Sequence, residues 1–501
     1  MASAGNKLTD KFSRIAALRP ARTLEPIAPP TERESDELAQ LLGATAESNR
    51  FGEHLALRRW FATPEPFFEA GDSCIAKALQ LLLAKSRANT RALRAANDPQ
   101  QWLFLDTETT GLSGGSGMYA FLIGLAWWDS GGLQVEQLFM RDHNDEYALL
   151  ETLRKRMAER SVLVTFNGKT FDWPLLKTRY VMTRTIAPHP FDLHLDFLHP
   201  ARQIWRPRLL SVRLAELEEH VLHVSPSSRL DWTREADIDG SMIPQLYFDY
   251  VRRGAAQPLV PVFQHNQMDL RGLAAIAGRV IEVLAGACNT DSSRANACQL
   301  RDVVEDSHDL FGVSRLLVNR GANNLAQKSY EAAILAGLPV GLARRATRDL
   351  AKIAKRAGDH AKAAELWESL LEPRAGRVRA RRNTAGDAIA PQSLTLERIL
   401  LRGMTAAAHD STRALREQLE ACEELAIHFE RRARDLDRAI QITRHGIALV
   451  KRAKSARRAD RFAAASGINP EFTRIETRME KRLTRLLAKF SINPESLLRS
   501  R

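Results

Sequence analysis

Residues 103–112 read LFLDTETTGL and decide the fold prediction. The apolar run at 103–105 is typical of a buried strand, and two acids spaced by one residue follow it. Because alternate residues of a strand share a face, we expect Asp106 and Glu108 to project side by side. Adjacent carboxylates repel each other unless a cation lies between them, and their hard oxygen atoms suit Mg²⁺ or Mn²⁺ rather than zinc. The alternative is a solvated strand end without a ligand.

The composition is that of a basic globular protein. The chain has 501 residues and a net charge of +13, which favours a polyanion such as nucleic acid as partner. Its four cysteines form no C-x-x-C pair, so the sequence supports neither a zinc knuckle nor a redox motif. Residues 1–20 lack the apolar core of a signal peptide, and the apolar run at 120–128 is too short to span a bilayer. We therefore expect a cytoplasmic protein that does not enter a membrane.

Two further polar signals follow the first. Residues 166–176 read FNGKTFDWPLL, in which a strand ends at Asn-Gly and Asp172 opens a helix; alone, Asp172 would be read as a helix cap. Residues 265–269 read HNQMD and open a predicted helix over 270–284. His265 and Asp269 share one face of that helix, although an exposed polar first turn would give the same pattern.

The periodicity around these motifs predicts an α/β domain. Strands are expected at 103–105, 119–128, 134–139 and 162–166, and helices at 145–160 and 172–183, which gives a mixed central sheet flanked by helices. Prolines between residues 20 and 66 argue against long regular elements before residue 70, and a helix is expected over 75–94.

The last two fifths of the chain read as helical. Gly321-x4-Ala326-x3-Tyr330 matches Gly358-x4-Ala363-x3-Trp367 at an offset of 37 residues, close to a helix–turn–helix repeat. A third, weaker unit is expected at 423–450, and a basic loop at 373–391. The tail at 451–501 holds 14 Lys or Arg against 5 Asp or Glu, which suits either a solvated helical face or a phosphate-contacting surface.

Taken together, the order D-x-E, N-G-x-x-F-D and H-x-x-x-D resembles the DEDD superfamily of two-metal exonucleases, which have an RNase H-like fold. The resemblance is closest to the YprB-type RNase H-like domains, which are joined to tetratricopeptide-like repeats. It covers about residues 103–284. The expected domains are an N-terminal extension at 1–95, partly helical, an RNase H-like nuclease domain at 96–288 and a helical repeat domain with a basic tail at 300–501.

The resemblance implies the roles of individual residues. Asp106, Glu108, Asp172 and Asp269 become the acids that hold two Mg²⁺ or Mn²⁺ ions. His265 becomes the candidate general base, but it lies four residues before Asp269, where the histidine branch of the superfamily usually has five, so an orienting role stays open. The expected substrate contacts are Thr107, Asn167, Lys169 and Phe171, and the additional acids Asp192 and Asp196 are expected to be structural.

The function implied by the resemblance is a divalent-metal-dependent nuclease, a 3′–5′ exonuclease acting on single-stranded DNA or RNA. Paired divalent ions suit this chemistry because they can bind the attacking water and the leaving oxygen of a phosphodiester together. One alternative is a nucleic-acid-binding or scaffolding protein whose repeats recruit a protein partner and whose nuclease domain is weak or inactive. Another is a metal phosphoesterase that acts on nucleotides.

Overall fold

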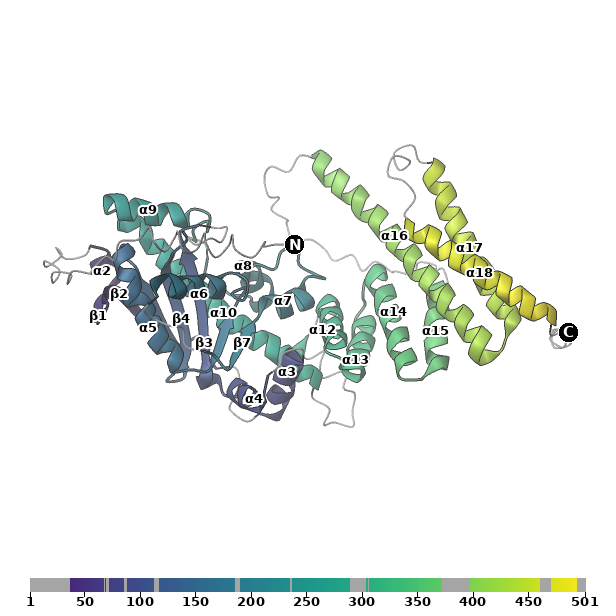
Figure 1. Cartoon of the computed structure of the whole chain (residues 1–501), viewed down its shortest axis with the longest axis horizontal. Helices are drawn as coiled ribbons and strands as arrows, with labels where there is room; N and C mark the ends of the chain where they lie inside the picture. The colour runs from purple at the N-terminus through teal and green to yellow at the C-terminus, as the bar shows by residue number, and fades with distance from the viewer. Residues whose placement is uncertain are drawn as a thin grey trace, which may run out of the picture.

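The computed structural model describes residues 37–66, 68, 72–84, 88–111, 117–184, 190–234, 237–288, 303–304, 306–371, 396–459 and 470–492, without the side chains of 396–411, 456–459, 470 and 492. The chain is elongated, with a sheet domain at one end and a helical arm at the other (Figure 1). An α/β domain of mixed sheet and helices followed by an all-helical region confirms the predicted fold class.

The sheet domain is built on seven strands in the order β1-β2-β5-β4-β3-β6-β7. In this order, the neighbouring pairs β1–β2, β2–β5, β5–β4 and β4–β3 are antiparallel. The pairs β3–β6 and β6–β7 are parallel. The strands are β1 (Thr45–Asn49), β2 (Gly52–Phe61), β3 (Trp102–Thr109), β4 (Ala120–Asp129), β5 (Gly132–Phe139), β6 (Val162–Thr165) and β7 (Leu193–Asp196).

Strand β3 lies inside this sheet and is buried on both faces at its start. Phe104 packs into one hydrophobic cluster and Leu105 into another, as expected for alternating side chains. Asp106 and Glu108 continue the face of Phe104, while Thr107 continues the face of Leu105. The alternation therefore places the two acids side by side, as the sequence indicated.

Helices cover both faces of the sheet. The cluster that contains Phe104 also takes in side chains of α3, α7, α8 and α10, and the other cluster takes in side chains of α2, α5, α6 and α9. The helices are α2 (Glu37–Leu42), α3 (Ser73–Leu83), α4 (Thr90–Ala96), α5 (Glu146–Ala158), α6 (Asp172–Thr183), α7 (Leu198–Trp205), α8 (Leu214–Leu217), α9 (Ile243–Arg253) and α10 (Val260–Cys288).

The region before residue 100 differs from the sequence prediction. Residues 45–61 form two strands of the main sheet, and the ten-residue β2 contradicts the expectation of no long element before residue 70. The prolines flank this strand and do not interrupt it, since none lies between Pro30 and Pro64. The single helix expected over 75–94 is two helices, α3 and α4, because Asp72 and Asn89 each cap a separate helix start.

The arm consists of antiparallel helices stacked away from the sheet. In the two aligned segments, Gly321 and Gly358 have φ values of +80° and +85° after α12 and α14, which is why glycine recurs there. Ala326, Tyr330, Ala363 and Trp367 are buried between the paired helices. The helices are α12 (Ser307–Asn319), α13 (Asn323–Leu335), α14 (Val340–Arg356), α15 (His360–Leu371), α16 (Leu396–His428), α17 (Leu436–Ala459) and α18 (Pro470–Ile492).

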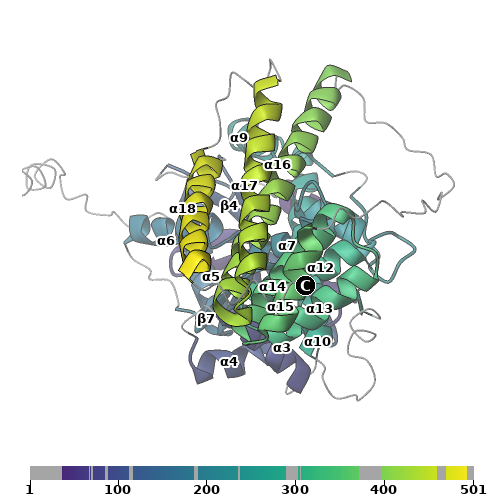
Figure 2. The ribbon, with the colours of Figure 1, turned by 90° about the vertical axis from the view of Figure 1, so that its right-hand side faces the viewer.

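The long helices α16, α17 and α18 form the far end of the arm, and α12–α15 lie between them and the sheet domain (Figures 1 and 2). The predicted basic loop at 373–391 lies outside the described residues, as does part of the predicted tail. No helix in the described ranges is both long enough and apolar enough to cross a membrane.

The arm is fixed to the sheet domain where α12 meets α7. Gly312 approaches the backbone of Ile204 so closely that an added Cβ would overlap its carbonyl oxygen. Arg208 donates two hydrogen bonds to Asp309, at 3.0 and 2.9 Å. One hydrophobic cluster runs from the sheet through α7 and α10 to α12, α13 and α14. The sheet domain and the first helices of the arm therefore share a core.

Replacing Gly312 with alanine should loosen this junction. The new methyl group must push α12 away from α7, so we expect Gly312→Ala to lower the free energy of unfolding by about 1–3 kcal/mol. Urea denaturation measures the change. Gly117→Ala is the matched control, because a Cβ there has no neighbour within 4 Å among the described residues. Equal stability of both variants would contradict the close approach of α12 and α7.

Candidate active site

Asp106 lies at the centre of a buried polar network between the sheet and α10. Its Oδ2 accepts a hydrogen bond from Asn266 Nδ2 at 2.8 Å, and Gln137 in turn donates to Asn266 Oδ1 at 2.8 Å. Gly124, paired with Asp106 in β4, leaves the space in which the Asn266 side chain lies. Burial, together with the charges of Asp269, Glu108 and Asp172, raises the pKa of Asp106 well above its ordinary value.

Glu108 belongs to the same group of carboxylates. Burial and the negative charges of Asp269 and Asp172 raise the pKa of Glu108 to about 8, against the opposing effect of His265. Such a shift means that ionised carboxylates repel one another in this space and are poorly solvated. A divalent cation would relieve both costs.

Asp172 joins the group from the other side of β3. It is the first residue of α6, whose bounds match the predicted helix, and Phe171 takes the cap position. The Asp172 carboxylate accepts a hydrogen bond from Thr107 Oγ1 at 2.5 Å. Burial raises the pKa of Asp172, although the Thr107 hydrogen bond opposes the shift. Asp172 is thus directed at the end of β3 and is not the helix cap that it would have been in the alternative interpretation.

His265 and Asp269 come from the interior of α10. The helix begins at Val260, ten residues before the predicted start at 270, so the interpretation as an exposed first turn is wrong. Pro261 did not prevent this earlier start, because proline is compatible with a first helical turn. His265 Nδ1 is 2.7 Å from Asp237 Oδ1, and His265 Nε2 is 3.7 Å from Asp269 Oδ2.

These carboxylates also set the charge of His265. Burial alone would lower the pKa of His265, but the negative charges of Asp269 and Glu108 and the contact with Asp237 outweigh it, so the pKa is raised. The protonated imidazole is the form that these three carboxylates favour.

An arginine is held within the group of acids. Arg234 donates to Asp269 Oδ1 at 2.5 Å and to Asp237 Oδ2 at 2.8 Å. Its Nε donates to Glu218 Oε2 at 2.7 Å, and a glycine at position 272 gives the Glu218 carboxylate its space. Arg234 therefore supplies a positive charge to Asp269 in this structure.

The loop after β6 lies beside the acids. Asn167 has a φ of +74°, a conformation that asparagine tolerates better than most residues. Asp196 accepts hydrogen bonds from the backbone amides of Asn167 and Lys169 at 2.9 and 3.0 Å. The Lys169 side chain and Phe171, which is 55% exposed, remain accessible. Asp196 holds the loop in shape, in agreement with the structural role expected for it.

The donor set fits hard divalent cations by its chemistry, because it consists of half-buried carboxylates whose mutual repulsion a cation would relieve. As the side chains stand, however, no three His, Cys, Asp or Glu residues within the described ranges are grouped so that they could hold a metal ion. The reason is visible in the contacts above, since Asn266, Thr107 and Arg234 each engage a carboxylate oxygen. Ion binding would have to reorganise these contacts.

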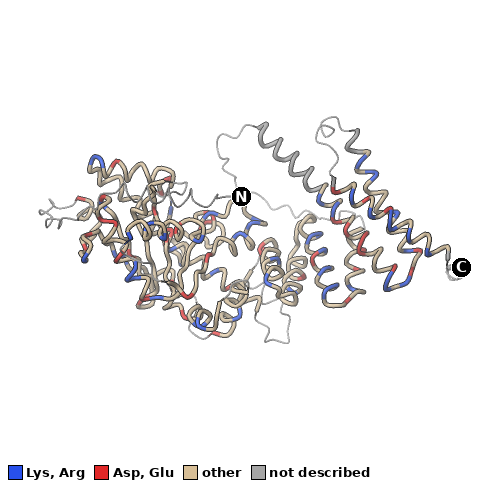
Figure 3. The backbone as a smooth tube through the Cα atoms, in the orientation of Figure 1, with Lys and Arg blue, Asp and Glu red and all other residues tan. Residues whose placement is uncertain are grey.

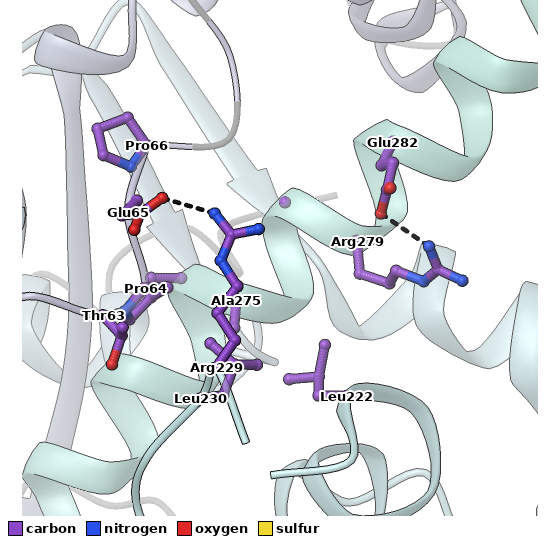
Figure 4. A pocket seen from close by; sticks show the side chains of 12 residues that line it. Thr63, Pro64, Glu65, Pro66, Leu222, Arg229, Leu230, Ala275, Arg279 and Glu282 are labelled. Atoms are coloured by element: carbon purple, nitrogen blue, oxygen red, sulfur yellow. Dashed lines mark hydrogen bonds and ion pairs between the residues drawn. The ribbon is translucent and has the colours of Figure 1, made fainter. Parts of the chain in front are cut away.

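In the described part of the chain three pockets lie near this region, and the largest of these three, of about 430 Å³, is lined by Glu218 and Arg234. One of about 330 Å³ reaches the site through Asp237 and is also lined by Gln264, Gln267 and Arg271. Another of about 350 Å³ lies between the loop after β2 and α10, and contains none of the grouped acids (Figure 4). Its charged groups neutralise each other in the pairs Arg229–Glu65 and Arg279–Glu282, at 2.5 and 2.7 Å. The acids at the end of β3 are therefore the better candidate for catalysis.

Sequence reasoning assigned no role to five residues of this network, which are Arg234, Glu218, Asn266, Asp237 and Gln137. Arg234 and Glu218 are 35 and 51 positions from Asp269 and belong to no motif, so no signal in one sequence identifies them. Asn266 lies inside the HNQMD motif but was given no role. Its position one residue after His265 on a helix already directed at the acids was a usable signal.

Comparison with known proteins supports an RNase H-like domain in this part of the chain. The family model described as RNase H superfamily matches residues 103–281. YprB of Bacillus subtilis (strain 168), an uncharacterised protein, is 29% identical over 263 residues, which cover 48% of this chain and 61% of YprB. The matched region contains all of the grouped acids, and the chain spans less than two thirds of the length of this relative.

The pKa of Glu108 predicts how stability depends on pH in the absence of metal. The ordinary pKa of Glu108 is 4.5, and its pKa in the folded protein is about 8. At pH values between these two, the folded protein binds more protons at Glu108 than the unfolded chain does. The free energy of unfolding must therefore fall as pH rises through this window. We expect Glu108→Gln to reduce that fall, measured by urea denaturation in EDTA between about pH 5 and about pH 8.5.

Glu37→Gln is the control, since Glu37 is exposed at the start of α2. It should leave the pH dependence of the wild type unchanged. Parallel curves for the wild type and Glu108→Gln would show that Glu108 does not carry the predicted charge penalty.

Proposed function

Because residues 103–281 form an RNase H-like domain of the YprB type, we propose that this protein is a divalent-metal-dependent nuclease. The single observation that carries the proposal is the convergence of Asp106, Glu108, Asp172 and Asp269, half-buried acids whose charges act on one another. Carboxylates grouped in this way serve poorly as structural residues and well as cation ligands.

Asp106, Glu108, Asp172 and Asp269 would hold two Mg²⁺ or Mn²⁺ ions. When bound, such ions supply positive charge to the scissile phosphodiester and make a water more acidic. The residues of the chain do the rest. Before ions bind, Asn266 orients Asp106 and Thr107 orients Asp172, and both hydrogen bonds would shift when the carboxylates take up the ions.

His265 would act at the opposite side of the group. Its Nδ1 is engaged by Asp237, so Nε2 is the nitrogen directed at Asp269 and the reacting groups. In this position it can orient Asp269, and it can accept a proton once cations neutralise the surrounding carboxylates and lower its pKa. These are the two roles that the sequence left open.

The substrate is proposed to be a nucleic acid strand whose end enters beside the loop after β6. Lys169 offers a positive charge to a phosphate, Asn167 lies at the base of this loop, and the exposed ring of Phe171 offers a stacking surface for a base. By resemblance, we propose 3′–5′ exonuclease activity on single-stranded DNA or RNA. The helical arm is proposed to be a repeat domain of the tetratricopeptide type that can also bind a protein partner.

The contacts of Arg234 favour a second candidate. Because Arg234 already neutralises part of the acidic group, the domain could bind nucleic acid with little or no hydrolysis. This is the scaffolding alternative, and the assay below separates it from the nuclease.

Purified protein with Mn²⁺ or Mg²⁺ should shorten end-labelled single-stranded oligonucleotides, and EDTA should stop the reaction. Asp106→Asn removes one charge from the carboxylate group and should reduce the rate by roughly 100-fold or more, the scale expected for losing a group that stabilises a transition state. Gel electrophoresis of products from 3′- and 5′-labelled DNA and RNA gives the rate, the polarity and the preferred sugar.

Asp129→Asn is the matched control. Asp129 is exposed and is the last residue of β4, at the end of that strand away from the grouped acids. It should cleave like the wild type. Binding without cleavage by the wild type, unchanged in Asp106→Asn, would reject the nuclease in favour of the scaffolding protein.

A further inference from the structure

Arg234 places a largely buried positive charge beside the grouped acids. Basic and acidic residues are interspersed over the sheet domain and the arm (Figure 3). A surface pair such as Arg229–Glu65 leaves both side chains in contact with water, at 80% and 49% exposed. The Arg234 side chain is only 14% exposed, and that of its partner Glu218 is 3% exposed. Charges at this depth are unfavourable unless they are paired, so the partners of Arg234 determine what it can do.

Glu218 anchors the guanidinium without help from the acids at the end of β3. Arg234 Nε donates to Glu218 Oε2 and Arg234 Nη2 donates to Glu218 Oε1, both at 2.7 Å, which is the forked geometry of a strong arginine–carboxylate pair. Trp232 Nε1 donates to the same Oε2 at 3.0 Å, and a Cβ at Gly272 would lie 2.0 Å from Oε1. This close packing fixes Glu218, and therefore Arg234, whether or not Arg234 contacts Asp269.

The same guanidinium also reaches the acids at the end of β3. Arg234 Nη1 donates to Asp237 Oδ2 at 2.8 Å, and Arg234 Nη2 donates to Asp269 Oδ1 at 2.5 Å. The other oxygen of Asp269, Oδ2, is 3.7 Å from His265 Nε2. Both oxygens of Asp269 therefore face a basic side chain, and Asp269 is the acid of the group that is most directly neutralised by the protein itself.

The contact between Arg234 and Asp269 is the one that a divalent ion would have to replace. A Mg²⁺ ion binds a carboxylate oxygen at about 2.1 Å, and the guanidinium lies in front of Asp269 Oδ1 where such an ion would be. If Arg234 leaves Asp269, its hydrogen bonds to Glu218 and Asp237 can remain. The exchange therefore gives Asp269 an ion of twice the charge and leaves the charge of Arg234 paired, so it can be reversible.

We propose that Arg234 is a built-in competitor of the metal ion at Asp269, which neutralises this acid until a divalent ion binds and then yields its place while Glu218 retains it. This inference rests on the proposed function, which supplies the ion that competes. It differs from the scaffolding alternative, in which Arg234 takes the place of an ion permanently. The consequence is that Arg234 sets the concentration of divalent ion that the site requires.

The test measures the affinity of the whole chain for Mn²⁺ and needs no substrate. The variant Arg234→Gln/Glu218→Gln removes the competitor together with its anchor, so the net charge is unchanged and no buried carboxylate at position 218 is left without a partner. Isothermal titration calorimetry, after metal is removed with EDTA, should show that this variant binds Mn²⁺ about 10-fold more tightly than the wild type. A factor of ten corresponds to about 1.4 kcal/mol, close to the contribution of one hydrogen bond between charged groups.

Arg154→Gln/Glu151→Gln is the matched control, because this pair on α5 has the same forked geometry, at 2.9 and 3.0 Å, and loses the same groups. It should bind Mn²⁺ like the wild type. Thermal unfolding in EDTA checks that both double variants fold. If the first does not, Arg234→Lys replaces it. The lysine keeps the charge, but one ammonium group cannot hold both oxygens of Glu218 and also reach Asp269, so Mn²⁺ should again bind more tightly than in the wild type.

The outcomes separate this inference from the proposed function. Tighter Mn²⁺ binding by the Arg234 variant, but not by the control, supports the competitor even if the wild type takes up no Mn²⁺ and fails as a metal-dependent nuclease. Equal or weaker binding by the Arg234 variant overturns the competitor, even if the wild type binds Mn²⁺ and cleaves. An equal gain in the control also overturns it, since the loss of any forked pair would then account for the effect. If neither the wild type nor the variants bind Mn²⁺, the competitor and the proposed metal site are both wrong.

Discussion

Repulsion among half-buried carboxylates at the end of β3 is the constraint on which the rest of the site depends. Alternation along the strand forces Asp106 and Glu108 onto one face, and α6 and α10 bring Asp172 and Asp269 to the same place. A folded chain tolerates such a group only if something neutralises it. In this structure hydrogen bonds from Asn266 and Thr107 and the guanidinium of Arg234 do so.

The surrounding fold is arranged to keep these groups in reach of one another. Gly124 allows the side chain of Asn266 to approach β3, and Asp196 holds the loop that precedes Asp172. The same hydrophobic core then extends through α7 into α12, which fixes the first helices of the arm relative to the acids. The grouped acids and the first helices of the arm therefore hold a fixed position relative to each other.

The sequence predicted the elements with a clear local signal. The strand–helix order around β3, the bounds of α6 and the helical C-terminal region follow from periodicity and helix-start residues that need no distant partner. It did not predict β1 and β2, since the pairing of β2 with β5 that joins this hairpin to the sheet is a long-range contact, nor did it predict the start of α10. The link from Arg234 to Asp269 joins segments with no shared motif, so only the folded chain identifies it.

The most direct test of the central claim is to count bound cations. Titration of the metal-free protein with Mn²⁺, followed by electron paramagnetic resonance of the free ion, should show two ions bound per chain. Asp106→Asn should lose at least one of them. If the wild type leaves all Mn²⁺ free in solution, the carboxylates at the end of β3 are neutralised by Arg234 and its neighbours alone, and the account of a metal-dependent site is wrong.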